Sequence, residues 1–212
     1  MSKQETSDKI LDAAEEVFGR QGFAATTIKH IGEKANVNTA LLYYYYADKE
    51  ALYHAVLRRR IQQLAAAISP PIMSARTATD AISTFARVYT EALLQHPTLP
   101  RLMLREILDH DAAHALPEMR QAVGGLMVHF VELVRQAQEA GEFRSDVDPM
   151  KAVISTLGQI VYAFLAQPLI QGVLLQRDTT EPDPVWLRAF GAHASDFALA
   201  ALRVPALSSE RN

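Results

Sequence analysis

Four consecutive tyrosines, at positions 43 to 46, are the residues of this chain whose types most clearly suggest chemistry. They follow Thr39 in a short segment that carries several hydroxyl groups and almost no charge. Hydroxyl groups of this kind form hydrogen bonds with phosphate oxygens and with the edges of nucleic-acid bases. A run of tyrosines is also typical of half-buried packing. The element that presents the rings therefore decides between the two interpretations.

That element is the second of two short predicted helices. The first, residues 27–35, has Ile28, Ile31 and Ala35 on one face, and a turn follows over 35–38. Asn36 tolerates the left-handed backbone that most residues avoid, and Asn38 is a favourable N-cap. Two short helices joined by such a turn form a helix-turn-helix, whose second helix enters the major groove of DNA. The sequence therefore predicts double-stranded DNA as a partner.

The faces of the second helix divide its residues. Leu42 and Tyr46 lie four residues apart, share one face and are expected to be buried. Thr39, Ala40, Leu41, Tyr44 and Tyr45 are expected to point outward. Lys49 begins the next helix, whose N-terminus favours phosphate. The predicted DNA-contacting residues are Thr27, Lys29, Asn38, Thr39, Ala40, Leu41, Tyr43, Tyr44, Tyr45 and Lys49.

This segment resembles the TetR family of one-component transcriptional regulators, and the resemblance covers about the first third of the chain. The matching residues are Thr27, Ile28, Ile31, Ala35, Val37, Ala40, Leu42, Tyr43, Tyr45, Lys49, Glu50 and Leu52. The chain departs from the family pattern at four positions. It has Gly32 where the pattern has alanine, Asn36 where it has glycine, Asn38 where it has serine and Tyr46 where it has phenylalanine. The two asparagines retain the turn and cap chemistry. Gly32 lowers helix propensity by about 1 kcal/mol relative to alanine.

Helical patterns continue along the rest of the chain, so the predicted fold class is all-α. A three-helix helix-turn-helix domain precedes a larger helical domain for effector binding and dimerisation. The predicted boundaries are a DNA-binding domain at 1–50, a connecting long helix at 51–70, an effector-binding and dimerisation domain at 71–205 and a disordered tail at 206–212. Pro70 and Pro71 are expected to end the long helix near Ile68, because proline disfavours helix in the preceding residue. Further helices are predicted at 77–95, 98–110, 117–140, 149–176 and 183–203.

The resemblance implies a homodimeric repressor that leaves a pseudo-palindromic operator when a small, mainly apolar effector binds. Small residues on the last two helices favour close helix packing between subunits. The predicted dimer interface contains Gly158, Tyr162, Ala166, Ala194, Phe197, Ala198 and Ala201. The predicted effector pocket contains Phe85, Tyr89, Met103, Glu106, Ile107, Met127, His129, Phe130 and Tyr162. Glu106 or His129 is expected to be the polar anchor.

Composition is compatible with this function but does not select it. The formal net charge is −3, and residues 1–68 hold nine lysines and arginines against eight acidic residues. The absence of cysteine excludes disulfides and thiolate catalysis. No secretory signal is visible, and the apolar stretch at 152–165 is too short to span a bilayer. We therefore expect a cytoplasmic protein with no membrane partner. Arg58, Arg59 and Arg60 are expected to form a solvated helix face.

Two other classes of protein stay open as alternatives, an all-helical small-molecule enzyme and a helical protein-interaction module. The chain has no glycine-rich phosphate loop, no HExxH and no GxSxG motif. His110 and His114 have a spacing that suits a divalent metal, but a solvated helix end explains them as well. We therefore predict no catalytic residues, no metal and no cofactor.

Overall fold

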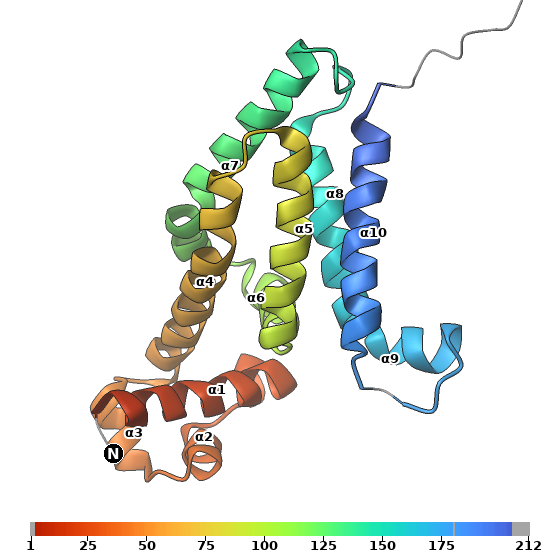
Figure 1. The fold of residues 1–212 in the computed structure, drawn as a ribbon. Coiled ribbons are helices and arrows are strands. Elements are labelled where there is room, and N and C mark those ends of the chain that lie inside the picture. Colours follow the sequence, from red (N-terminus) through yellow and green to blue (C-terminus); the bar gives the residue numbers. More distant parts are fainter. Residues whose placement is uncertain (1–2, 180, 205–212) are drawn as a thin grey trace, which may run out of the picture. The chain divides into compact units, whose positions relative to one another are not determined.

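The computed structural model describes residues 3–179 and 181–204 (Figure 1). Within these ranges the chain is helical, and an isolated bridge between Phe143 and Arg203 is the only β-type pairing. The predicted all-α class is confirmed. The predicted disordered tail at 206–212 lies outside the described residues. The chain divides into two compact units, Met1–Ala66 with Gln95–Val123, and Ala67–Leu94 with Gly124–Asn212.

The first unit contains the predicted helix-turn-helix. Its elements are α1 (Lys3–Ala25), α2 (Ile28–Ala35), α3 (Thr39–Tyr45), most of α4 (Lys49–Met73), α6 (Leu99–His110) and the beginning of α7 (Leu116–Glu139). Gly22 interrupts α1 with a φ of 80°, in the left-handed region that glycine tolerates. Phe18, Ile31 and Tyr53 are among the side chains that are completely buried in one core shared by these helices.

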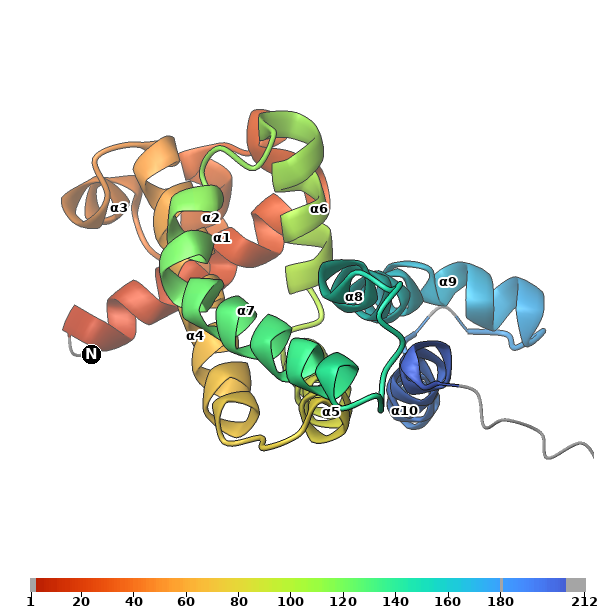
Figure 2. The ribbon, with the colours of Figure 1, turned by 90° about the horizontal axis from the view of Figure 1, so that it is seen from above.

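The second unit contains the remaining helices. They are α5 (Ala78–Gln95, whose last residue falls in the first unit), the rest of α7, α8 (Pro149–Leu165), α9 (Gln167–Leu169), the π-helix Ile170–Leu174 and α10 (Pro184–Leu202). Asp148 caps α8 and Asp183 caps α10, each through its carboxylate. Helices α8 and α10 pack side by side (Figures 1 and 2). Among the described residues no single helix is long and apolar enough to cross a membrane; α8 passes such a test only jointly with 167–174, across a bend of 64°.

One predicted helix end and one predicted uninterrupted helix were wrong. Helix α4 does not end near Ile68 but continues through Pro70 and Pro71 to Met73. Ile68 and Ile72 lie one turn apart and are both buried, so apolar packing favours a further turn that proline alone disfavours. The predicted helix at 149–176 is broken at Ala166, where the backbone leaves the helical region.

The boundaries of the compact units differ from those of the predicted domains. Helix α6 and the first residues of α7 belong to the unit that contains the helix-turn-helix, although the sequence assigned them to the effector domain. Their packing explains this, because Leu102 of α6 is fully buried in the same core as Phe18 and Tyr53.

Candidate nucleic-acid interface

The turn between α2 and α3 is fixed by side-chain caps. Thr27 ends the preceding loop, and its Oγ1 accepts a hydrogen bond of 3.1 Å from the amide of His30. Asn36 has a φ of 53°, in the left-handed region, and closes α2. The Oδ1 atom of Asn38 accepts a bond of 2.7 Å from the amide of Leu41 and thereby starts α3. The roles of Asn36 and Asn38 agree with the sequence predictions.

Gly32 is the point of closest approach between α2 and the turn. The amide of Val37 donates to the carbonyl of Gly32 over 2.9 Å. A Cβ atom on Gly32 would lie 3.0 Å from the carbonyl oxygen of Val37 and 3.2 Å from the Cδ1 atom of Leu42. The alanine of the family pattern is therefore tight in this chain, which explains a glycine that helix propensity alone disfavours.

Helix α3 has a buried side and an exposed side. Leu42 is 1% exposed and packs in the same core as Ile31, which fixes the orientation of the helix. The exposed side chains of α3 are Thr39, Ala40, Tyr43 and Tyr44. Tyr44 is 70% exposed and Tyr43 is 53% exposed, so both rings are accessible to a partner. Leu41, which we expected to be outward, is half-buried.

The other two tyrosines are bound to α1. The hydroxyl of Tyr45 donates to the carbonyl of Lys3 over 3.1 Å, and the hydroxyl of Tyr46 lies 3.0 Å from Oγ of Ser7. Both rings are half-buried. Ser7 therefore explains how this chain accommodates a tyrosine where the family pattern has phenylalanine. The hydroxyl of Tyr45, expected to reach phosphate, is used inside the protein. The ammonium of Lys3 lies 5.4 Å from the ring centre of Tyr44.

Of the two lysines predicted to contact DNA, one is exposed and the other is bound within the protein. Lys29 extends from α2 with 81% of its side chain exposed, and Glu33 is 3.9 Å away. The ammonium of Lys49 donates to the carbonyls of Phe23 (2.9 Å) and Thr26 (3.0 Å) at the end of α1. It also lies 4.3 Å from the ring centre of Phe23. Lys49 thus joins α4 to α1, and Lys29 is the accessible charge.

Ion pairs connect α1 to the helices around it. The Lys34 ammonium, 2.8 Å from Glu16, lowers the pKa of that carboxyl. Arg59 donates to Asp12 over 2.7 Å, and Arg60 donates to Glu15. The side chains of Arg59 and Arg60 are only 15% and 11% exposed. The expectation that the arginine run is a solvated face is therefore wrong for these two residues, because carboxylates of α1 bind them.

Part of the predicted effector pocket forms an aromatic group in the second unit. The rings of Phe85 and Tyr89 stack at 5.3 Å, and those of Phe85 and Phe130 meet edge to face at 6.5 Å. Burial raises the pKa of Tyr89 to about 12. His129 has a buried Nε2 atom with no hydrogen-bond partner among the described residues. Met127 is half-buried.

Other predicted pocket residues have different surroundings. Met103, Glu106 and Ile107 belong to the first unit. The carboxylate of Glu106 is fully buried there and accepts hydrogen bonds from the Tyr53 hydroxyl and from two backbone amides. Ile107 is 52% exposed, and Tyr162 of α8 is 66% exposed.

The predicted dimer residues separate into buried and exposed groups. Ala166, Ala194 and Ala198 are buried within the second unit, where α8 and α10 pack together. Gly158, Tyr162, Phe197 and Ala201 are exposed. Exposed apolar side chains that were not among the predicted interface residues include Ile154, Leu169, Val173, Leu174 and Val185. A four-residue spacing from Ile154 through Gly158 to Tyr162 was a signal that could have found the first of them.

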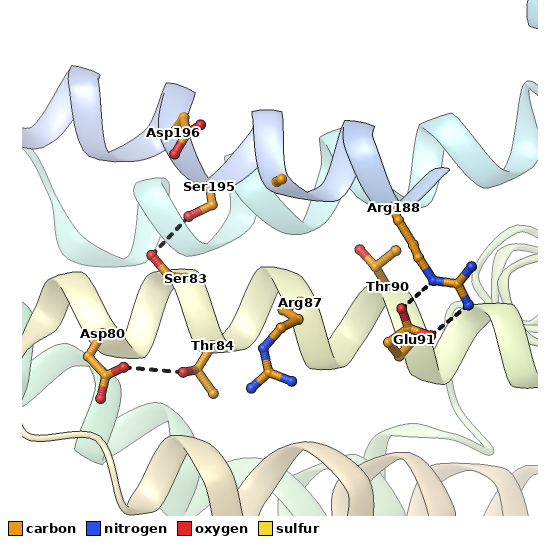
Figure 3. A pocket seen from close by; sticks show the side chains of 10 residues that line it. Asp80, Ser83, Thr84, Arg87, Thr90, Glu91, Arg188, Ser195 and Asp196 are labelled. Atoms are coloured by element: carbon orange, nitrogen blue, oxygen red, sulfur yellow. Dashed lines mark hydrogen bonds and ion pairs between the residues drawn. The ribbon is translucent and has the colours of Figure 1, made fainter. Parts of the chain in front are cut away.

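A groove with polar side chains is lined by residues of α5 and α10 (Figure 3). Its volume is about 660 Å³, and its lining is Asp80, Ser83, Thr84, Arg87, Thr90, Glu91, Arg188, Ala192, Ser195 and Asp196. Arg188 forms two hydrogen bonds with Glu91, of 2.6 and 3.1 Å, and Ser195 donates to Ser83 over 3.2 Å. No residue of this groove was among the predicted effector contacts.

Comparisons with known proteins agree with the geometry of the helix-turn-helix. Residues 10–56 match the family described as bacterial regulatory proteins, tetR family, and residues 79–196 match the tetracyclin repressor-like C-terminal domain. The transcriptional repressor NicS of Pseudomonas putida is 28% identical over 67% of this chain and 68% of its own length. The repressor SCO4008 of Streptomyces coelicolor is 30% identical over 64% of this chain and 66% of its own.

The same fold occurs in solved structures. A bacterial regulatory protein of the tetR family from Rhodococcus RHA1 superposes with a TM-score of 0.73, at 22% identity over 97% of this chain and 100% of that one. The second family match alone spans more than half of the sequence. The chain therefore belongs to the TetR family of bacterial transcriptional regulators, which are DNA-binding proteins and not enzymes.

Proposed function

We propose that this regulator is a cytoplasmic, homodimeric repressor that binds a pseudo-palindromic operator and is released by a small, mainly apolar effector. The observation that carries the proposal is the exposed side of α3, which Leu42 and the caps hold in a fixed orientation. A recognition helix of this kind reads base edges from its N-terminal residues. The relatives named above as repressors favour repression over activation.

Within this surface the proposed contacts differ in kind. Thr39 offers a hydroxyl to a base edge, and the methyl group of Ala40 suits a thymine methyl. Tyr43 and Tyr44 reach toward phosphate oxygens, and Lys29 adds a charge on α2. Thr27 and Asn38 contribute through the backbone they cap. Leu41, Tyr45 and Lys49 are proposed to support the surface and not to touch DNA, because they are half-buried.

The proposed dimer uses an apolar face on α8 and α10. On α10 the rings of Trp186, Phe190, His193 and Phe197 follow one another at 5.1, 5.8 and 6.2 Å. Phe197 is 57% exposed, and Tyr162 of α8 is 66% exposed. Exposed apolar patches of this kind indicate a protein partner. A two-fold dimer would place two copies of α3 about one DNA turn apart, or roughly 34–36 Å.

The proposed effector contacts are those predicted residues that belong to the second unit. Phe85, Tyr89, Met127 and Phe130 supply apolar surface, and His129 has a buried nitrogen that lacks a partner. We propose that this nitrogen meets the polar group of a mainly apolar effector. The effector releases DNA by binding more tightly to the subunit arrangement in which the two α3 helices no longer match the operator.

The DNA interface is tested by placing a carboxylate on α3. Fluorescence anisotropy would measure binding of the purified protein to duplex DNA from upstream of its own gene. We expect the wild type to bind, and Ala40→Glu to bind at least about 100-fold more weakly, because the carboxylate faces phosphates and bases. Ala66→Glu makes the same change at an exposed alanine of α4 and should bind normally. Equal binding by Ala40→Glu and the wild type would exclude α3 as the recognition helix.

A further inference from the structure

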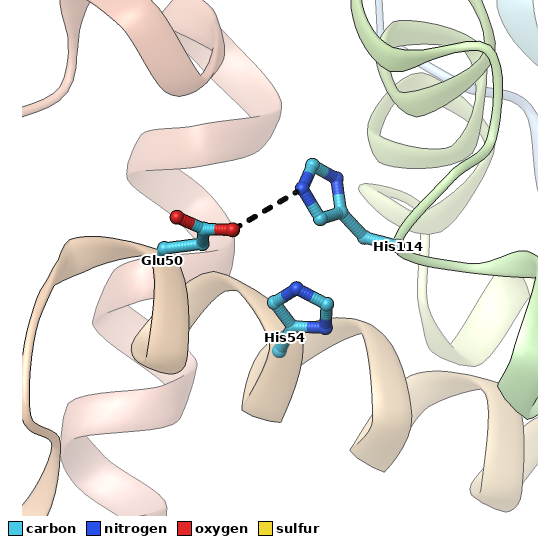
Figure 4. A group of neighbouring side chains, drawn as sticks. All are labelled: Glu50, His54 and His114. Atoms are coloured by element: carbon cyan, nitrogen blue, oxygen red, sulfur yellow. Dashed lines mark ion pairs between the residues drawn. The ribbon is translucent and has the colours of Figure 1, made fainter.

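Three potential metal ligands converge where α4 begins (Figure 4). Glu50 and His54 lie one turn apart on α4, so both project from the same face of the helix. His114 comes from the segment that connects α6 to α7. The ligand atoms of these three side chains all lie within 4.8 Å of one another. Nε2 of His114 is 3.9 Å from Oε1 of Glu50, and the His54 and His114 rings are 4.6 Å apart.

Glu106 fixes the orientation of His114. Its Oε2 lies 3.2 Å from Nδ1 of His114, and its Oε1 accepts the His114 amide over 2.7 Å. The carboxylate is itself held by the Tyr53 hydroxyl over 3.0 Å and is completely buried. Nδ1 is therefore engaged on the buried side, and Nε2 faces Glu50. A carboxylate behind a histidine in this way is typical of metal sites, where it orients the ring and raises its basicity.

We propose that Glu50, His54 and His114 bind a divalent cation of the Zn²⁺ type. Two imidazoles and one carboxylate are a ligand set that Zn²⁺ accepts, with a fourth position for water. Zn²⁺ binds such ligands at about 2.0–2.2 Å. Glu50 is exposed and His54 is half-buried, so an ion can reach both side chains from solvent.

A second group of potential ligands shares His114 but is a weaker candidate. It consists of Glu106, His110 and His114. Both oxygens of Glu106 already accept hydrogen bonds from the protein, so metal binding there would leave buried donors without partners. Nε2 of His110 is buried and has no hydrogen-bond partner in the described part of the chain, which makes His110 the residue that separates the two possibilities by experiment.

An ion at the proposed site would join α4 to the α6–α7 connection. Helix α4 begins at Lys49, a few residues after α3 ends at Tyr45. A restraint on the first turns of α4 therefore acts on the position of the recognition helix. This consequence rests on the proposed function, whereas the binding of the ion does not. Linkage requires that operator DNA change the affinity for Zn²⁺ by the same factor by which Zn²⁺ changes the affinity for the operator.

The first experiment measures Zn²⁺ binding by the purified protein against a chromophoric chelator. We expect one Zn²⁺ per subunit, with the affinity lowered at least about tenfold in His54→Gln and in Glu50→Gln, since each loses a ligand. His96→Gln, a half-buried histidine of the same unit that lies outside the cluster, and His110→Gln should bind as the wild type does. Thermal unfolding followed by circular dichroism would verify that each variant is folded.

The outcomes are distinct. Absence of Zn²⁺ binding by the wild type would overturn the site. Loss of binding in His110→Gln with retention in His54→Gln would overturn the ligand assignment and place the ion in the buried group. The second experiment repeats the operator titration with and without Zn²⁺. A Zn²⁺ effect on the wild type that His54→Gln lacks would support the coupling. Unchanged operator affinity in a Zn²⁺-loaded wild type would overturn the coupling, while operator binding itself tests the proposed function separately.

Discussion

Burial changes the acid–base chemistry of two tyrosines, one in each compact unit. Tyr89 lies in the aromatic group of the second unit, and burial raises its pKa to about 12. Burial also raises the pKa of Tyr53, and the adjacent Glu106 carboxylate raises it further. A neutral phenol in the native state and an ionised one in the unfolded chain together make stability depend on pH.

For Tyr89 the sign follows from its raised pKa. An unfolded tyrosine ionises near pH 10, so the unfolded chain loses this proton first and the native state is destabilised as the pH rises from about 10 to 12. We expect this loss of native-state stability to amount to about 2 kcal/mol between pH 10 and pH 12. About 1.4 kcal/mol is lost between pH 8 and pH 11, where urea unfolding measures it. Tyr89→Phe should lose less stability between the two pH values than the wild type, and an equal loss would contradict the assigned burial effect.

Residue roles were predictable from the sequence when they depend on near neighbours. Asn36 and Asn38 have the predicted turn and cap roles, because a cap involves residues two or three positions away. Tyr45 and Lys49 have partners at Lys3, Phe23 and Thr26, more than twenty positions away in the sequence. No local pattern distinguishes such a tyrosine or lysine from an exposed one.

At the scale of elements, the contact between α5 and α10 depends on one glycine. A Cβ atom on Gly191 would lie 2.3 Å from Oγ1 of Thr90 and 3.2 Å from its Cβ. The Thr90 hydroxyl is buried and donates to the carbonyl of Ala86 over 2.7 Å, so it is not free to move away. The sequence indicated only that small residues on this helix permit close packing, without identifying the neighbour.

Gly191→Ala is therefore expected to destabilise the protein, by about 1–3 kcal/mol, although alanine is the better helix former. Gly125→Ala is the matched control, because Gly125 lies on an exposed face of α7 with no atom within 4 Å of its added Cβ. That control should gain up to about 1 kcal/mol. Urea unfolding at neutral pH gives both values. Thr90→Ala should recover part of the loss in Gly191→Ala, and a Gly191→Ala variant as stable as the wild type would refute the close contact.

Helix positions were predictable to within a few residues, because apolar periodicity marks them. Helix interruptions were not predicted correctly. Pro70 and Pro71 predicted an end that buried Ile72 overrides. Pro168 lies two residues after the break at Ala166 and is a local signal for that break, which the predicted helix at 149–176 did not use. The prediction of pocket and interface residues had a related limit. Periodicity indicated that Ala194 and Ala198 pack against a helix, but not that this helix belongs to the same subunit.

At the scale of the whole molecule, charge alone does not account for DNA binding. The net charge is −3, and several cations near the helix-turn-helix are bound by carboxylates or carbonyls of the protein, among them Lys34, Lys49, Arg59 and Arg60. A single subunit therefore has few charges to offer to phosphates, and weak binding by one copy is expected. Affinity should depend on two recognition helices that act together, so we expect DNA binding to require the proposed dimer.

The dimer is tested at Phe197, which is 57% exposed on α10. Phe197→Glu should leave the subunit fold intact, because the side chain points outward, but it places a charge in the proposed apolar interface. We expect a dimer for the wild type and a monomer for this variant by light scattering at micromolar concentration. Leu108→Glu, at a side chain 71% exposed on α6, should stay dimeric. Operator affinity should fall when dimerisation is lost. A monomeric Phe197→Glu that binds the operator as tightly as the wild type would therefore overturn the two-copy mechanism.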